Sequence, residues 1–451
     1  MLFTEKIFKN KESNNKITIE TKKKLILDTV DLIENSEVFF ESYGTNYRKI
    51  EIHGNSIFIK YNERKYNVLL GEIFRDLKLK NNFSKEYVDE FISDLVTEIF
   101  EKGLDKVEKD PLMADIFEDT FYESIVYIPL DGIKMEKQLL TVGKINLREF
   151  TQKDADFHIQ NISYLMAINP HYTNKRANGI VELEKERISR LIGVCAEFQV
   201  YADPKKAIDL AEKECEKVLD LFRWTVSYIH HRNHNVYIGM KGEIPRSSRE
   251  TLVAKTDFRS YHHRSQIIGA KYKFEINDKN ISTMRRNGFF KISNILKKPN
   301  NNIKPFENSL LTAIHWFADS QTQKELGNEI LSLVICLEVF LSPSNEESIT
   351  SFISEAIAII LADKEHKEEL KTDVKHFYDI RSKIVHEGLI PSDDEENGYL
   401  RTVVKHLIFQ MIKEKDNIPS QDILVKHIAD EKNKQKLNVE LNLKKLKGID
   451  S

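Results

Sequence analysis

Arg381 and His386 are the residues whose types and spacing best suit chemistry in this chain. They stand five positions apart in residues 376–388, whose apolar residues recur at helical spacing. Gly388, just beyond the histidine, is a typical helix stop. The pattern predicts one helix with a fixed cation and a near-neutral proton carrier in its last turns. Such a pair suits the binding of a phosphate and the transfer of a proton.

The elements that must position this pair are predicted to be helices. After residue 305 the sequence is almost purely helical, and each segment carries an apolar stripe. The expected helices lie near residues 308–319, 323–341, 346–362, 366–387 and 395–415. Short connections between such helices are typical of an antiparallel bundle, which we place at residues 306–416. Residues 417–451 are interpreted as a C-terminal helix or tail.

The preceding residues mix strands and helices. We expect an α+β domain over residues 1–150 and an α/β middle region over residues 151–300, with a linker at 297–305. Predicted strands include residues 24–32, 48–52, 56–61, 65–69 and 194–202. Predicted helices are residues 85–102, 154–166 and 181–192, and a long helix that runs from Asp203-Pro204 to residue 229. Ser84 is the expected N-cap of the first of these helices. The fold class is therefore multidomain, with an α+β N-terminal region followed by an all-α C-terminal bundle.

Length and composition exclude several classes of protein. A chain of 451 residues is long enough for two or three domains. Since no apolar run approaches the roughly 20 residues needed to cross a bilayer, we expect no membrane span. The three cysteines lack metal spacing, which favours buried thiols in a reducing, cytoplasmic compartment. A Walker-type loop is absent, so nucleotide hydrolysis is disfavoured, and we expect no cofactor.

Charge is segregated along the chain, although the formal net charge is only −3. Residues 230–300 contain 15 Lys/Arg and 5 Asp/Glu, whereas residues 306–416 contain 11 Lys/Arg and 21 Asp/Glu. The first segment suits a polyanion and the second does not.

Three segments of the bundle resemble the Apea-like HEPN domain of bacterial phage-defence proteins. They are residues 313–317 (AIHWF), 333–341 (LVICLEVFL) and 378–386 (YDIRSKIVH), and the resemblance covers residues 306–415. The last segment has the Arg-x4-His form of the HEPN motif. Many HEPN ribonucleases have Asn, Asp or His directly after the arginine, whereas here that residue is Ser382, as is usual in the Apea-like branch.

The resemblance implies a metal-independent endoribonuclease in which Arg381 and His386 are catalytic. It also implies a homodimer formed through the HEPN bundle, with the two Arg/His pairs at the two-fold axis. In this interpretation the chain acts in phage defence by abortive infection and cleaves RNA, with tRNA as one candidate. The N-terminal region would sense infection, with a phage-encoded product as one candidate trigger. A toxin controlled by a separate antitoxin is a further interpretation.

Three residues are candidates for a supporting role. Glu338 lies in an otherwise apolar helix, where a lone carboxylate is costly unless it is paired. It either orients the Arg381/His386 pair or forms a structural ion pair with a lysine. Tyr378 and Ser382 either contact phosphate or occupy ordinary core and surface positions.

The basic segment supplies candidate RNA contacts, because arginines and aromatic residues alternate in it. The candidates are Arg232, Arg259, Arg264, Arg285 and Arg286. An ordinary basic surface is the competing interpretation. The histidines at 230, 231, 234, 262 and 263 lack cysteine or acidic companions, so we expect no metal site.

A non-catalytic protein remains the main alternative to a nuclease. In that hypothesis the bundle only dimerises and residues 230–300 bind nucleic acid, because the acidic bundle would itself repel RNA. If the nuclease interpretation holds, the acidic bundle should cut what the basic segment holds.

Overall fold

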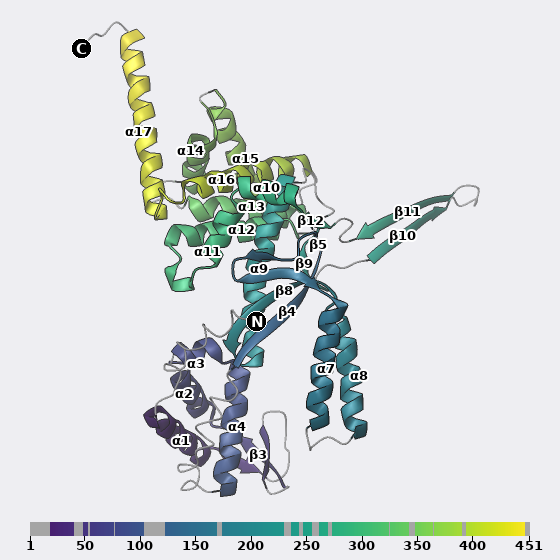
Figure 1. Cartoon of the computed structure of the whole chain (residues 1–451). Coiled ribbons are helices and arrows are strands. Elements are labelled where there is room, and N and C mark those ends of the chain that lie inside the picture. Colours follow the sequence, from purple (N-terminus) through teal and green to yellow (C-terminus); the bar gives the residue numbers. More distant parts are fainter. Residues whose placement is uncertain are drawn as a thin grey trace, which may run out of the picture. The chain divides into compact units, whose positions relative to one another are not determined.

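The computed structural model describes residues 19–39, 48–52, 55–75, 77–102, 122–168, 174–229, 236–242, 247–254, 261–268, 273–323, 325–341, 348–363, 365–389 and 394–446. The fold is mixed: an α+β N-terminal region precedes a helical C-terminal part (Figure 1). Contacts divide the chain into two compact units, Met1–Val126 with Gln199–Ala211, and Tyr127–Phe198 with Glu212–Ser451. Residues 127–150, which we assigned to the N-terminal domain from sequence, fall in the second unit.

The first unit packs helices against a small antiparallel sheet. Its elements are α1 (Ile19–Glu34), β1 (Glu37–Phe39), β2 (Arg48–Ile52), β3 (Asn55–Lys60), α2 (Glu63–Ile73), α3 (Leu77–Asn82) and α4 (Lys85–Lys102). The strand order is β1-β3-β2. Leu32, Ile59, Val88, Ile92 and Leu95 are fully buried in its core. The strands predicted at 48–52 and 56–61 and the helix predicted at 85–102 are confirmed.

Two strands predicted in this unit are wrong, because both segments are helical. Residues 24–32 belong to α1, in which Ile26, Thr29 and Leu32 are buried at a spacing of three. Residues 65–69 belong to α2, which begins where the Asn62 side chain accepts a hydrogen bond from the Lys65 N–H at 3.1 Å. Asn62 is therefore the N-cap of α2.

The second unit begins with a curled sheet of order β6-β7-β8-β4-β9 (Figure 1). Its elements are β4 (Tyr122–Asp131), β5 (Ile133–Met135), β6 (Leu140–Val142), β7 (Ile145–Phe150), α7 (Gln152–Ile168), α8 (Asn174–Ser189), β8 (Gly193–Ala202), α9 (Pro204–Ile229) and β9 (Gly239–Met240). One end of each of β4, β8 and α9 belongs to the first unit. Alternate residues of β7 are buried, as in a sheet with one covered face. The helices predicted at 154–166, 181–192 and from 203-204 to 229 are confirmed as α7, α8 and α9. The strand predicted at 194–202 is confirmed as β8.

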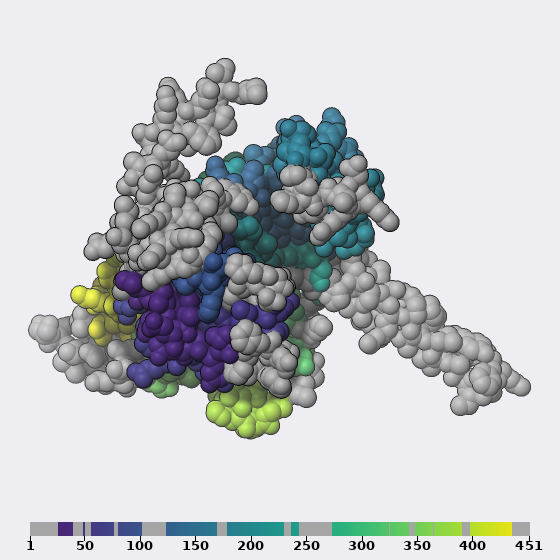
Figure 2. Space-filling model, turned by 90° about the horizontal axis from the view of Figure 1, so that it is seen from below, coloured from purple at the N-terminus to yellow at the C-terminus, as the bar shows by residue number. Residues whose placement is uncertain are grey.

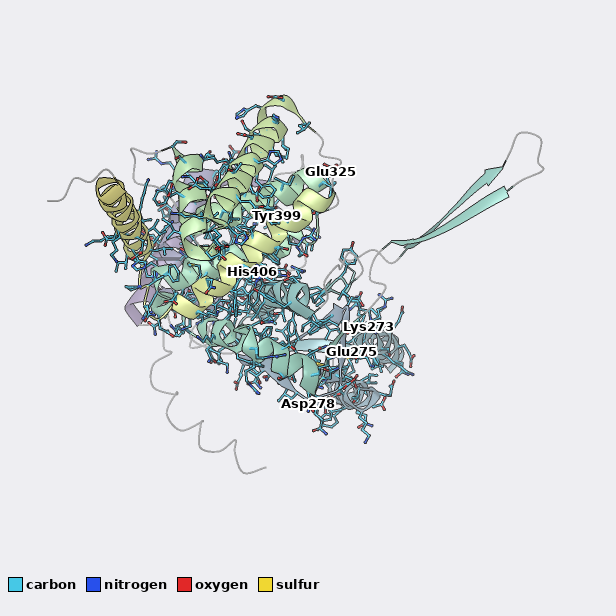
Figure 3. All side chains as sticks on the ribbon, turned by 90° about the horizontal axis from the view of Figure 1, so that it is seen from above. Lys273, Glu275, Asp278, Glu325, Tyr399 and His406 are labelled. Atoms are coloured by element: carbon cyan, nitrogen blue, oxygen red, sulfur yellow. The ribbon has the colours of Figure 1, made fainter. Side chains whose placement is uncertain are left out.

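Smaller elements lead from this sheet to the bundle. They are β10 (Ser247–Ala254), β11 (Tyr261–Ile268), β12 (Phe274–Ile276), α10 (Asp278–Arg286) and α11 (Phe289–Leu296). Strand β12 pairs in parallel with β5, and two ion pairs, Lys134–Glu275 at 2.9 Å and Lys137–Asp278 at 2.6 Å, reinforce this pairing. Figure 3 shows Glu275 and Asp278 close together in this region.

The connection at 297–305, predicted as a linker, is short and held in place. Lys298 Nζ lies 2.6 Å from the Glu307 carboxylate, and that carboxylate also accepts the Lys304 N–H at 3.1 Å. Because Glu307 is buried, these bonds tie the connection to the first bundle helix.

The C-terminal part is the predicted set of helices packed on one another. They are α12 (Pro305–Ser320), α13 (Leu326–Phe340), α14 (Ile349–Leu361), α15 (Lys367–Glu387), α16 (Asp394–Glu414) and α17 (Gln421–Leu446). Helices α12 and α13 pack together, as do α14 and α15, and α16 contacts α12, α13 and α14. In the part of the chain that the structure describes, no helix combines the length and apolar character needed to span a membrane.

Candidate functional site

Helix α15 carries the Arg381/His386 pair, and the predicted helix with its stop at Gly388 is confirmed. One face of α15, with Val374, Phe377 and Ile380, is buried against the bundle. Gly388 ends the helix with a φ of 68°, a left-handed conformation that a Cβ would strain. The Leu389 N–H then donates back to the Lys383 carbonyl at 3.3 Å. The two candidate catalytic residues therefore lie in the last turns of a well-anchored helix.

The two residues do not share one face of this helix. Five positions correspond to a rotation of about 140° and a rise of about 7.5 Å. Arg381 is 39% exposed and His386 is exposed. Between them around the helix lie Ser382, which is exposed, and Val385, a valine that is 54% exposed. One copy thus presents the cation and the imidazole on either side of a partly apolar strip.

Glu338 on α13 forms an ion pair with Arg381. Its Oε1 lies 3.8 Å from the arginine Nη2, and both side chains are only partly buried. This separation is longer than a strong hydrogen bond, so the ion pair steadies the guanidinium without fixing it rigidly. From the sequence we considered the Arg381/His386 pair or a lysine as the partner of Glu338, and the structure has Arg381 beside it.

Tyr378 and Ser382 take different positions. Tyr378 is buried, and its hydroxyl lacks a hydrogen-bond partner of ordinary geometry within the described residues. Burial raises the pKa of this phenol, and the nearby Glu338 charge raises it further. Ser382 lies on the surface. Tyr378 is thus a core residue beneath the site, while the Ser382 hydroxyl is accessible to a ligand.

A second charged cluster, which sequence reasoning missed, joins α9 to the bundle. His315 on α12 lies 2.8 Å from Asp220 through its Nδ1 atom, and Asp220 is buried. Arg223 bonds Asp220 at 3.0 Å, Glu216, and the Ile238 carbonyl at 2.8 Å. The sequence signal was a carboxylate at position 220 inside an apolar helical run, which needs a partner.

The electrostatics of this cluster favour a charged pair. The hydrogen bond that His315 makes to the Asp220 carboxylate raises the pKa of His315, and the Asp220 charge adds to that shift. Burial raises the pKa of Asp220, whereas His315 and Arg223 oppose that shift. Because His315 is about half exposed and gains a carboxylate partner, we take the raised His315 pKa as the dominant effect.

The structure describes the side chains of two of the five basic candidates. Arg285 and Arg286 are exposed at the end of α10, where Arg285 lies over the Phe290 ring and Arg286 bonds the Thr283 hydroxyl at 3.2 Å. Arg264 lies in β11 opposite Thr251 of β10. Arg232 and Arg259 lie outside the described residues, so the structure does not bring the five together as one surface.

The described residues contain no group of three His, Cys, Asp or Glu side chains placed to hold a metal ion. The histidines at 262 and 263 belong to β11, and those at 230, 231 and 234 lie outside the described residues. The three cysteines are buried and free, and burial raises the pKa of Cys195 to about 11. Such a thiol is a poor nucleophile near neutral pH.

Comparisons with family models, curated proteins and solved structures found no match to this chain.

Proposed function

We propose that the chain is a metal-independent endoribonuclease of the HEPN type that acts as a homodimer. The observation that supports this proposal is the placement of Arg381 and His386. They occupy the last turns of one bundle helix, with the histidine exposed and the arginine beside Glu338. The Arg-x4-His spacing and the order of the three HEPN-like segments are the sequence basis.

The chemistry requires no ion. The ribose 2′-hydroxyl of RNA attacks the adjacent phosphorus, the P–O5′ bond breaks, and the products carry a 2′,3′-cyclic phosphate and a 5′-hydroxyl. A histidine moves protons near neutral pH, so one His386 accepts the 2′-hydroxyl proton and the His386 of the second copy donates a proton to the leaving O5′. Arg381 holds the phosphate and stabilises the charge that grows on its oxygens.

Two copies are needed for a complete site in this scheme. In-line cleavage uses a base on one side of the phosphate and an acid on the other, whereas one copy supplies one histidine of the Arg-x4-His motif. The strip between Arg381 and His386 includes the exposed Val385, and Leu389 just beyond the helix is also exposed. Burial of these apolar side chains against a second copy would bring two Arg/His pairs to the two-fold axis.

The substrate in this proposal is RNA in the bacterial cytoplasm, with tRNA as one candidate, cleaved in phage defence by abortive infection. The acidic bundle repels a polyanion, so residues 230–300 would hold the RNA that the bundle cuts. The N-terminal region would control the nuclease, in response to a trigger such as a phage product.

Cleavage by the full chain tests the proposal. Purified protein with EDTA should release RNA fragments that end in cyclic phosphate. Arg381→Ala and His386→Ala should each lower the rate by at least about 100-fold, as expected for loss of a general acid–base or charge-stabilising group. Lys383→Ala is the matched control, because Lys383 is an exposed cation on the same helix. Folded Arg381 and His386 variants that cleave as fast as wild type would refute the assignment, and a strictly monomeric active protein would refute the composite site.

The acidic balance of the bundle favours one alternative, a non-catalytic protein whose bundle only dimerises. Under this alternative the protein binds RNA but releases no cleavage products at any protein concentration. Binding without cleavage by the wild-type full chain, in the presence of its trigger and in the absence of any antitoxin, would favour this function over the nuclease.

A further inference from the structure

Four lysines that are far apart in the sequence gather where α11, the start of α12 and the end of α16 adjoin. They are Lys291 on α11, Lys298 and Lys304 in the connection to α12, and Lys415 directly after α16. Gly288 fixes this arrangement, because a Cβ at that position would lie 2.5 Å from the Ile412 side chain. Helix α11 therefore begins directly against the last turn of α16. We call the surface that carries the four lysines the lysine corner.

Two carboxylates lie among these lysines and show that they share one surface. Lys298 Nζ lies 2.6 Å from the buried Glu307 carboxylate, and Lys415 Nζ lies 2.7 Å from that of Asp416. Burial raises the pKa of Glu307, but the hydrogen bond from Lys298 and the charges of Lys298 and Lys415 lower it overall. The hydrogen bond from Lys415 lowers the pKa of Asp416.

Two further lysines act on the same carboxylate from other parts of the chain. The charges of Lys291 and Lys304 add to the lowering of the Asp416 pKa. Charges near the surface influence one another mainly within a Debye length, about 8 to 10 Å at ordinary salt. Positions 291, 304 and 416, which are up to 125 residues apart, are therefore neighbours in the fold.

The lysine corner is positive, whereas the bundle as a whole is acidic. The four lysines and the two carboxylates, Glu307 and Asp416, leave a formal charge of +2, and the adjoining Lys413 and Glu414 cancel. Residues 306–416 together carry 11 Lys/Arg and 21 Asp/Glu. A local excess of cations in an acidic domain restricts binding of an anion to that place.

Polar amides surround the lysines, and apolar groups do not. Asn294 is exposed and follows Lys291 by three positions, so both lie on one face of α11. Residues 300–302, between Lys298 and Lys304, are three further exposed asparagines. No large apolar side chain is exposed in residues 289–308 or 409–418, all of which the structure describes.

This composition suits a nucleic-acid backbone better than a membrane or an apolar protein surface. Lysine is a flexible point charge for phosphate oxygens, and asparagine amides also bond phosphates and sugars. A helix that inserts into a membrane surface presents large apolar side chains beside its cations, and the lysine corner presents none among its described residues.

We propose that the lysine corner binds the sugar–phosphate backbone of RNA. The inference deepens the proposed function and rests on it for the choice of RNA as the polyanion. Lys291 and Lys298 belong to the basic segment, residues 230–300, and Lys415 belongs to the bundle. The corner thus joins the two oppositely charged parts of the chain in one binding surface, so that RNA held by the basic segment also contacts the bundle.

Chemical footprinting of lysines on the full chain tests the contact directly. The His386→Ala chain keeps the RNA intact while an amine-acetylating ester modifies exposed lysines, and mass spectrometry measures the rate at each position. Saturating single-stranded RNA should slow acetylation of Lys291 and Lys304 at least about fivefold, because a lysine bound to phosphate is withdrawn from the reagent. Lys153 and Lys185, exposed on the α7–α8 hairpin, should react at an unchanged rate. This hairpin, in blue and teal, presents a broad outer surface in Figure 2.

Paired substitutions separate contact with phosphate from a structural role. Lys291→Gln with Lys304→Gln should lower RNA affinity about tenfold at low salt and make the slope of log K against log salt less negative by about 1.4. Lys291→Arg with Lys304→Arg should keep wild-type affinity, because arginine also binds phosphate. Lys153→Gln with Lys185→Gln removes the same charge elsewhere and should change affinity little.

The outcomes also separate this inference from the proposed function. Absence of protection at Lys291 and Lys304, equal protection at Lys153 and Lys185, or equal loss of affinity in both glutamine pairs overturns the lysine corner. Protection by anionic lipid vesicles in place of RNA overturns it in favour of a membrane. Cleavage by the wild-type chain without this protection leaves the nuclease standing alone. Protection in a protein whose wild-type form never cleaves RNA supports the corner and counts against the nuclease.

Discussion

At the scale of single residues, the neighbours of Arg381 determine how it can act. Glu338 lies 3.8 Å away and is partly exposed, so it limits the arginine to a few orientations without neutralising it fully. Tyr378 is buried below, where its ring supports the helix rather than a phosphate. In the proposed nuclease, Arg381 would therefore be free to meet a phosphate, with Glu338 as its positioning partner.

The Arg381–Glu338 pair leads to a first prediction. Glu338→Gln keeps the shape of the side chain and removes its charge, so Arg381 loses its electrostatic guide. A half-exposed ion pair contributes about 1 kcal/mol or less, which corresponds to a fall in kcat of about 3- to 5-fold. RNA cleavage rates under single-turnover conditions measure this effect. Glu325→Gln, at the exposed start of the same helix (Figure 3), should leave the rate unchanged, and an equal loss in both variants would contradict the positioning role.

His315 leads to a second prediction, on stability. Its folded pKa is raised by Asp220, so protonated His315 stabilises the fold fully below its unfolded pKa of about 6.5. That contribution is lost as pH rises from about 6.5 through the higher folded pKa. The free energy of unfolding should fall over this window by less than about 1 kcal/mol, because His315 is half exposed. Urea unfolding at several pH values measures it. His315→Gln should remove this part of the pH dependence, whereas His376→Gln, exposed on α15, should keep it.

At the scale of elements, one buried carboxylate organises the start of two helices. Asp203 accepts the Lys205 and Lys206 N–H groups at the start of α9 and the Ser84 N–H at 2.7 Å. The Ser84 hydroxyl donates to Asp203 at 3.2 Å and accepts the Tyr87 N–H at the start of α4. Asp203 thus caps α9 and locks the α4 cap within the first unit.

Removal of this carboxylate is the third prediction. Asp203→Ala leaves the buried Ser84 N–H and the part-buried N–H groups at the start of α9 without this acceptor, which costs about 2 to 4 kcal/mol. Denaturant unfolding should show this loss as a lower midpoint for the first unit. Asp209→Ala, an exposed acid on α9, is the control. A shift of less than about 0.5 kcal/mol for Asp203→Ala, the range of ordinary surface changes, would contradict the role.

Sequence reasoning succeeded where the signal is local. The start of α9 at Pro204, the Ser84 cap of α4 and the Gly388 end of α15 all depend on a few adjacent residues. It failed for α1 and α2, whose Val, Ile and Tyr residues suggested strands, because burial against the rest of the unit decides between the two structures.

In the candidate site, too, local patterns were readable from the sequence and contacts between distant residues were not. The spacing of Arg381 and His386 was readable in the sequence, and Glu338 was suspected as an isolated acid. The His315–Asp220 bond was not, since it joins residues that are 95 positions apart and no local pattern specifies such a pairing.

At the scale of the whole molecule, opposite charges are concentrated in residues 230–300 and in the bundle. Residues 230–300 carry a net formal charge of +10 (15 Lys/Arg and 5 Asp/Glu) and the bundle, residues 306–416, carries −10 (11 and 21). A polyanion is attracted to the first and repelled by the second at low ionic strength. A nuclease built this way needs the basic segment to hold substrate at an acidic catalytic domain. RNA affinity should therefore depend on exposed arginines outside the bundle.

Arg285 and Arg286, exposed at the end of α10, allow a test of that division. If both contact phosphates of single-stranded RNA, their joint replacement by alanine releases about two fewer counterions. The slope of log K against log salt should become less negative by about 1.4, and affinity at low salt should fall about tenfold. Fluorescence anisotropy over a salt series measures both quantities. The matched control, Lys185→Ala with Arg187→Ala, removes the same charge from exposed positions of α8. Equal changes in both double variants would mean that net charge alone attracts RNA, and no change in either would remove α10 from the binding surface.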